Sequence, residues 1–197
     1  MKKRLLILML SVVLLIGMTA CAENDYHKMI CEQLDNLADK SYQGVNLRVV
    51  TTMGDVQLSA NYNLTQDNIS YSIECFNTLP PDADVVGMSP EYKTTHTGSA
   101  KIVDGEVTEF DQEGVELPSY DELKGNFNFD ASNLTNVVAQ NNSLSADVIS
   151  PAIFYGSEVN MQNMKIKVEY TATALGKIII TYQTDRSTVI TTYEFVI

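Results

Sequence analysis

The sequence predicts an α+β domain built on a single curved antiparallel β-sheet, because one stretch has helical periodicity and several others alternate with period two. The helical stretch covers about residues 24–40, where Tyr26, Ile30, Leu34 and Leu37 recur between acidic and polar neighbours. This pattern is typical of an amphipathic helix with one apolar stripe. A helix of this kind needs a sheet to cover.

Three runs of alternating apolar and polar residues follow the helix, over about residues 45–49, 56–64 and 69–75. The breaks between them, Met53-Gly54-Asp55 and Thr65-Gln66-Asp67-Asn68, are short and rich in turn-forming residues. We therefore expect consecutive antiparallel hairpins.

A further strand is expected from about Tyr92 to Val103, after an irregular connection at 77–89. Asp104-Gly105 then gives a strong two-residue hairpin signal, which places Ile102 opposite Val107 and Lys101 opposite Thr108.

Residues 111–142 are rich in Asn, Asp and Gly and predict only one or two short helical turns. Alternation returns over about 144–148, and Ser150-Pro151 predicts a short helical turn through Phe154.

The C-terminal third predicts a three-stranded meander with one apolar and one polar face. Its strands cover about residues 164–172, 178–182 and 189–197, and turns at Leu175-Gly176 and Asp185-Arg186 separate them.

The N-terminus has the parts of a secretion signal. A basic start is followed by an apolar stretch over residues 5–16 and a small-residue cleavage site that ends at Ala20. The apolar stretch is too short for a membrane span, since crossing a bilayer takes about 20 apolar residues. We expect residues 1–20 to be removed.

Met18-Thr19-Ala20-Cys21 resembles the lipobox of bacterial lipoproteins, although that family usually has Leu at the position of Met18 and Ser or Ala at that of Thr19. The resemblance implies that Cys21 becomes the first residue and carries acyl chains such as palmitate. Two or more chains anchor a protein stably. We therefore expect a lipidated tether over 21–25 and one domain over 26–197, held on the extracytoplasmic side of the cell membrane.

Charge and motifs narrow the function further. Losing Lys2, Lys3 and Arg4 with the signal changes the formal net charge from −12 to −15, which argues against nucleic acid as a partner. The two histidines, His27 and His96, have no metal-ligand spacing around them. Serine-nucleophile and phosphate-binding motifs are absent from the sequence. We expect no enzymatic activity, cofactor or metal.

Cys31 and Cys75 remain after the acylated cysteine is set aside. In an oxidising compartment they can form a disulfide that joins the helix to the sheet. They can equally be free thiols that pack as small apolar residues. The sequence leaves both alternatives open.

The order of elements, with the long middle connection and the closing alternation through Tyr182 and Tyr193-Glu194-Phe195, resembles the half-barrel fold of the LolA, LolB and LppX-like carriers of lipid and lipoprotein. This resemblance implies a concave apolar face, partly covered by the N-terminal helix and short helical segments, that accepts acyl chains. Nine residues share the apolar parity of neighbouring strands and are the candidate ligand-binding residues. They are Leu47, Val49, Leu58, Tyr62, Tyr71, Ile73, Ile166, Val168 and Ile180.

Two functions remain open. One is an anchored carrier or sensor of a lipid-like ligand that binds to the concave face. The other is a cell-envelope interaction or structural module with a filled core, which binds a protein partner through its loops or edge strands.

Overall fold

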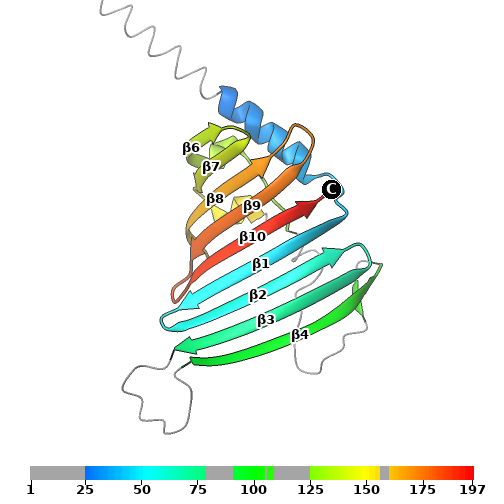
Figure 1. The fold of residues 1–197 in the computed structure, drawn as a ribbon. Helices are drawn as coiled ribbons and strands as arrows, with labels where there is room; N and C mark the ends of the chain where they lie inside the picture. The colour runs from blue at the N-terminus through cyan, green and yellow to red at the C-terminus, as the bar shows by residue number, and fades with distance from the viewer. Residues whose placement is uncertain (1–24, 79–90, 105, 109–124, 156–159) are drawn as a thin grey trace, which may run out of the picture.

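The computed structural model describes residues 25–78, 91–104, 106–108, 125–155 and 160–197. The strands of these segments form one 10-stranded sheet, in the order β5-β4-β3-β2-β1-β10-β9-β8-β7-β6 (Figure 1). They are β1 Gly44–Met53, β2 Val56–Thr65, β3 Asn68–Thr78, β4 Glu91–Val103, β5 Glu106–Thr108, β6 Leu134–Gln140, β7 Ser143–Val148, β8 Gln162–Tyr170, β9 Leu175–Gln183 and β10 Thr188–Val196.

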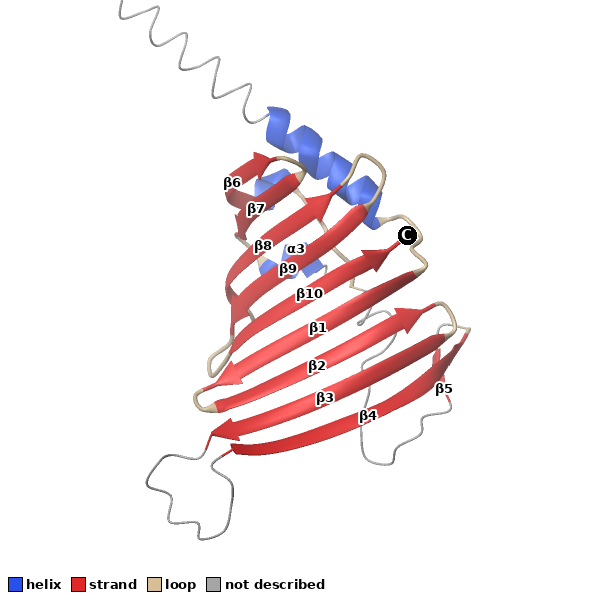
Figure 2. Cartoon of the chain, viewed as in Figure 1, coloured by secondary structure: helices blue, strands red, loops and turns tan. Residues whose placement is uncertain are grey.

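The predicted single curved antiparallel sheet is confirmed, because each strand of this order pairs antiparallel with its neighbours and the sheet does not close on itself. The described chain is, however, mostly β (Figure 2). Its helices are an N-terminal helix over residues 25–38, the 3-10 turn η1 Ala131–Asn133 and the short helix α3 Pro151–Tyr155.

The two predicted meanders become one sheet because the last strand returns to the first. β10 pairs with β1, so that Leu47 lies opposite Tyr193 on one side and opposite Tyr62 of β2 on the other. The hairpin predicted at Asp104-Gly105 has the expected register, with Ile102 opposite Val107.

One edge strand was not predicted. β6 lies within the region expected to be irregular, and it pairs with β7 through a register shift between Thr135 and Val138. Asn136 adopts a positive φ of 52° inside this shift, a conformation that Asn accepts more readily than most residues. The bulge interrupts the period-two alternation, which explains why the strand is hidden in the sequence.

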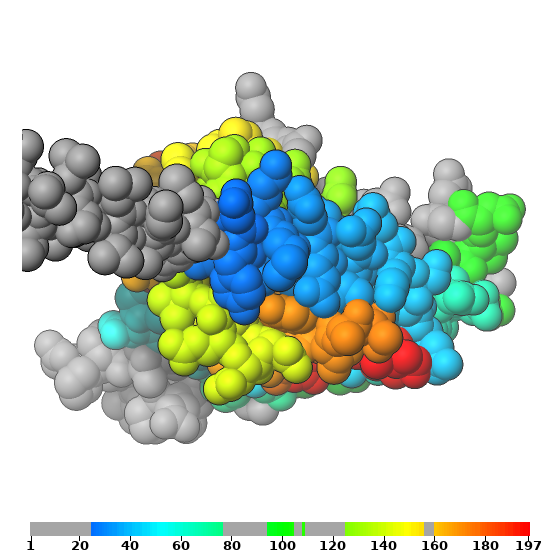
Figure 3. Space-filling view, turned by 90° about the horizontal axis from the view of Figure 1, so that it is seen from above, coloured from blue at the N-terminus to red at the C-terminus, as the bar shows by residue number. Residues whose placement is uncertain are grey.

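The sheet has an inner face, defined here as the one that carries Leu47, Ile166 and Ile180, and a polar outer face. The N-terminal helix packs on the inner side, across the ends of the strands from β6 to β9 (Figure 3). Its predicted apolar stripe is buried at Ile30, Leu34 and Leu37, but Tyr26, the first residue of the predicted stripe, is 49% exposed. The buried residues are Ile30 at 2%, Cys31 at 2%, Leu34 at 0% and Leu37 at 2% exposure.

Hydrogen bonds fix the helix to the sheet. The Tyr42 hydroxyl, just after the helix, donates to the Leu37 carbonyl and accepts from the Leu175 backbone N–H. Asp35 accepts from the backbone N–H of Phe129.

No helix in the described part of the chain is both long enough and apolar enough to span a membrane. The signal, Cys21 and most of the tether lie outside the described residues.

Candidate functional site

All nine candidate ligand-binding residues lie on the inner face. Cross-strand pairs place Leu47 beside Tyr62, and Tyr62 beside Tyr71. On the other half of the sheet, Ile166 lies opposite Ile180. The shared parity that the sequence suggested therefore corresponds to one continuous surface, and ligand binding on it stays a prediction.

The half of the inner face centred on β8 is a filled core. Ile166, Val168 and Ile180 are 3%, 0% and 0% exposed. Aromatic rings of the segment from Phe127 to Tyr155 belong to the same buried cluster. The ring of Phe154 packs edge-on to that of Phe129, with 5.6 Å between the ring centroids. In this half, the filled-core alternative describes the packing.

The other half of the inner face is less fully covered. Val49 on β1, Leu58 on β2 and Ile73 on β3 are only half-buried, although their neighbour Ala60 is buried. Val49 and Ile73 both lie directly opposite Ala60, so these three residues form one cross-strand row. The apolar face therefore changes from fully buried near β8 to partly accessible near β2.

Tyrosines run through the centre of this face. Tyr62 and Tyr193 are 9% and 5% exposed, and the ring of Phe127 packs edge-on to that of Tyr193 at 4.9 Å. Tyr155 of α3 and Tyr182 of β9 lie near enough to interact electrostatically with Tyr193. Tyr155, Tyr182 and Tyr193 are absent from the predicted set, although the strand parity of the last two placed them on the apolar face.

Burial sets the protonation of these hydroxyls. It raises the pKa of Tyr155 and Tyr193 well above the ordinary value of a phenol, and the proximity of Tyr182 raises both further. The pKa of Tyr182 is raised by burial, and a hydrogen bond with Thr191 offsets part of this effect. All three are neutral hydrogen-bond donors at ordinary pH.

The inner face carries no Lys, Arg, Asp or Glu at any register position of the described strands. His96 lies opposite Ile73 on β4, and its side chain is exposed. Acidic and basic side chains lie instead on the outer face, where Lys177 pairs with Glu194 at 2.6 Å.

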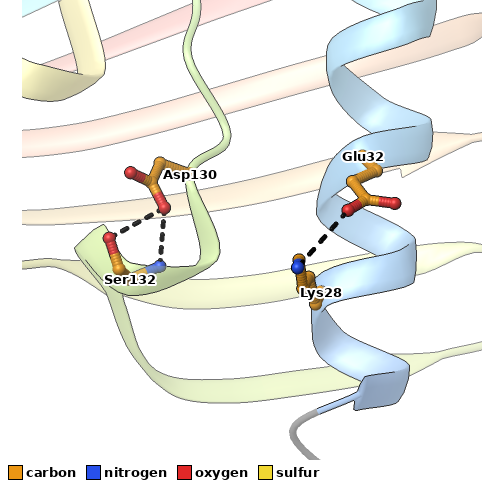
Figure 4. A network of polar contacts seen from close by, with 4 residues as sticks. All are labelled: Lys28, Glu32, Asp130 and Ser132. Atoms are coloured by element: carbon orange, nitrogen blue, oxygen red, sulfur yellow. Dashed lines mark hydrogen bonds and ion pairs between the residues drawn. The ribbon is translucent and has the colours of Figure 1, made fainter.

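A hollow between the N-terminal helix and η1 is lined partly by acidic residues, among them Glu32, Asp35 and Asp130. Asp35 accepts a hydrogen bond from the backbone N–H of Phe129, and Glu32 and Asp130 have the partners drawn in Figure 4. Asp130 accepts from the backbone and hydroxyl of Ser132, which lowers its pKa, and Glu32 pairs with Lys28. The described residues contain no group of three or more His, Cys, Asp or Glu suited to a metal ion.

Cys31 and Cys75 are both free, so the structure takes the second of the two alternatives left open by the sequence. The reason is their placement. Cys31 is a residue of the N-terminal helix and is buried in the core. Cys75 is half-buried on β3, where it lies opposite Leu58 and Thr94 of the neighbouring strands. Burial, reinforced by nearby acidic groups such as Asp35, raises the pKa of the Cys31 thiol to about 11.

The outer face has a polar groove of about 680 Å³ over β3, β2, β1, β10 and β9. Short amide and hydroxyl side chains line much of it, including Asn46 and Asn63, whose side chains are hydrogen-bonded at 2.7 Å. Arg48 adds an exposed cation. Apart from the polar parity of the strands, nothing in the sequence indicated this groove.

The chain matches no family model and no curated protein sequence. Its function is therefore argued from the chemistry of these surfaces.

Proposed function

We propose that the protein is a lipid-anchored, extracytoplasmic, non-enzymatic protein that binds or carries an apolar ligand on the inner face of its sheet. In this proposal the sheet is a half-barrel, whose concave inner side is partly covered by the N-terminal helix, η1 and α3. The anchor is the acylated Cys21, and the domain begins within a few residues of it.

One observation carries the ligand-binding part of the proposal. The same apolar surface that is fully packed near Ile166 is only half-buried at Leu58 and Ile73. Soluble proteins seldom leave contiguous apolar area exposed without using it to bind something. An apolar surface with few polar groups is what a lipid-like ligand requires.

The test uses the chain from Ala22 to Ile197, which keeps every described element and the whole buried core. Its folding is first checked by circular dichroism. Organic extraction of the purified protein, followed by mass spectrometry, then shows whether it retains a lipid, and titration with diphenylhexatriene measures binding of an apolar probe. We expect saturable binding that depends on the inner face.

A matched pair of variants on β2 makes the test specific. Leu58→Arg places a charge on the half-buried inner side, whereas Gln57→Arg places the same charge on the exposed outer side of the neighbouring position. We expect the first to lower probe affinity at least tenfold and the second to leave it unchanged. Empty extracts and no saturable binding by the parent protein would refute the proposal.

The second candidate is a cell-envelope interaction or structural module, and the outer-face groove around Arg48 favours it. This function predicts that a protein from the envelope is retained by the wild-type chain and lost with Arg48→Glu. Cross-linking in intact cells measures this directly, with Arg186→Glu, at an exposed position outside the groove lining, as the control.

A further inference from the structure

Buried tyrosines form a row across the middle of the inner face. Tyr193, Leu47, Tyr62 and Tyr71 occupy directly opposed positions on β10, β1, β2 and β3. Neighbouring strands lie about 4.8 Å apart, so the row presents closely spaced side chains on one surface. It lies next to the row of Val49, Ala60 and Ile73, where the inner face becomes accessible.

Two hydroxyls in this row lack a partner in the described part of the chain. The Tyr62 and Tyr193 residues are more than nine-tenths buried, but neither hydroxyl oxygen is fully enclosed, and no hydrogen bond joins either hydroxyl to another described residue. Each hydroxyl is therefore open to donate a hydrogen bond to a ligand that lies against the inner face. By contrast, the Tyr42 hydroxyl has a partner on both sides.

The charges of the neighbouring residues determine which ligand groups can bind to these two hydroxyls. The inner-face register positions carry no basic residue, and the described Lys and Arg side chains lie on the outer face or at exposed positions. The parts of the sequence between residues 79 and 159 that lie outside the description contain one basic residue, Lys124, among many acidic ones. The described residues of this face would therefore offer no counter-charge to a buried ionised carboxylate or phosphate, which is costly.

We propose that the hydroxyls of Tyr62 and Tyr193 bind an uncharged oxygen acceptor of the ligand, such as an ester carbonyl, so that the protein selects neutral lipids over ionised fatty acids. This inference rests on the proposed apolar-ligand function and specifies its ligand class. Tyr155 and Tyr182, which interact with Tyr193, add neutral donors on the same side.

The test compares three fluorescent probes with the chain from Ala22 to Ile197 at pH 8. They are methyl parinarate, parinarate as the ionised acid with the same chain, and diphenylhexatriene, which is a pure hydrocarbon. We expect the ester to bind at least tenfold more tightly than the ionised acid. Tyr62→Phe and Tyr193→Phe should each weaken ester binding about three- to tenfold, the range for one neutral hydrogen bond.

Hydrocarbon binding provides the internal control, because it needs the apolar surface but no hydroxyl. It should stay within about twofold in both variants, and Tyr26→Phe, at an exposed position of the N-terminal helix, should leave all three affinities unchanged. Thermal melts of each variant check that the fold is intact.

The outcomes separate the two proposals. If the ionised acid binds as tightly as the ester, or if both Tyr→Phe variants keep full ester affinity, the neutral-lipid inference is wrong while apolar binding stands. If diphenylhexatriene and both parinarates all fail to bind saturably, the apolar-ligand function itself fails, and the tyrosine subsite fails with it.

Discussion

The carboxylate of Asp35 accepts a hydrogen bond of 2.7 Å from the backbone N–H of Phe129, which joins residues 94 positions apart. Asp35 lies on the N-terminal helix, and Phe129 is fully buried at the start of the chain that leads into η1. This contact fixes the helix over the segment that covers the inner face. It also holds a carboxylate in a place that burial makes unfavourable for charge.

Asp35→Ala should lower the free energy of unfolding by about 1 to 3 kcal/mol, because it leaves the N–H of Phe129 without its acceptor. Asp35→Asn keeps an oxygen in the same place and should cost less. Urea denaturation measures both. Equal losses for Ala and Asn would show that the hydrogen bond does not carry the effect.

The stability should also depend on pH through Asp35. Burial raises its pKa above the ordinary 3.8, although the hydrogen bond from Phe129 opposes part of this shift. Because the pKa is raised in the folded state, the contribution of this group is fully present below the unfolded pKa and is lost as pH rises through the folded pKa. The difference in stability between Asp35→Asn and wild type should therefore shift in favour of the variant as pH rises from below 3.8 through the raised folded pKa. Parallel melts across this range would contradict the prediction if the difference stayed constant.

Tyr42→Phe should destabilise the protein by about 1 to 3 kcal/mol. The hydroxyl of Tyr42 bridges the Leu37 carbonyl and the N–H of Leu175, and Leu175 is fully buried, so its N–H would lose its partner. The same substitution at the exposed Tyr26 should change stability by less than about 0.5 kcal/mol. Denaturant titrations of the two variants test this, and equal effects would argue against the bridge.

The sequence predicted most strands and the inner-face parity because both are local. Alternation identifies which residues share a face, and Asp104-Gly105 determines a hairpin register without reference to the rest of the fold. β6 escaped prediction because the bulge at Asn136 breaks its alternation. Such a feature depends on pairing with β7 and leaves little local signal.

The candidate site was predictable only in part. Parity placed Leu58 and Ile166 on one face, yet one is half-buried and the other is in the core. That difference depends on where the helix and the segment from Phe127 to Tyr155 pack, which is not encoded within any one strand. The tyrosine row also depends on the pairing of β1 with β10, which are far apart in the sequence.

Cys31 should react with thiol reagents far more slowly than Cys75. The Cys31 residue is 2% exposed, and burial raises the pKa of its thiol to about 11, so little thiolate forms at pH 8. Cys75 is half-buried on β3. Alkylation with iodoacetamide at pH 8, followed by peptide mass spectrometry, gives the two rates. Recovery of a peptide that links the two cysteines without any labelling would contradict the free-thiol structure.

Cys21→Ala should release the protein from membranes or block its maturation, because it removes the thiol that the lipobox-like Met18-Thr19-Ala20-Cys21 offers for acylation. Membrane fractionation with palmitate labelling measures the effect. Cys75→Ala, which leaves the lipobox intact, is the matched control and should retain full labelling. Unchanged labelling and membrane retention in Cys21→Ala would rule out the proposed anchor.

Ile166 and Leu58 should respond differently to truncation, because they lie on opposite halves of the inner face. Ile166→Ala removes a side chain that is 3% exposed and should lower the free energy of unfolding by about 2 to 5 kcal/mol. Leu58→Ala removes a half-buried side chain, so the loss should be smaller, about 1 to 2 kcal/mol, and diphenylhexatriene affinity should fall instead. Urea titration and probe binding of both variants provide the comparison. If Leu58→Ala cost as much stability as Ile166→Ala and left probe binding intact, the face near β2 would be packed core, and the ligand would have to bind elsewhere.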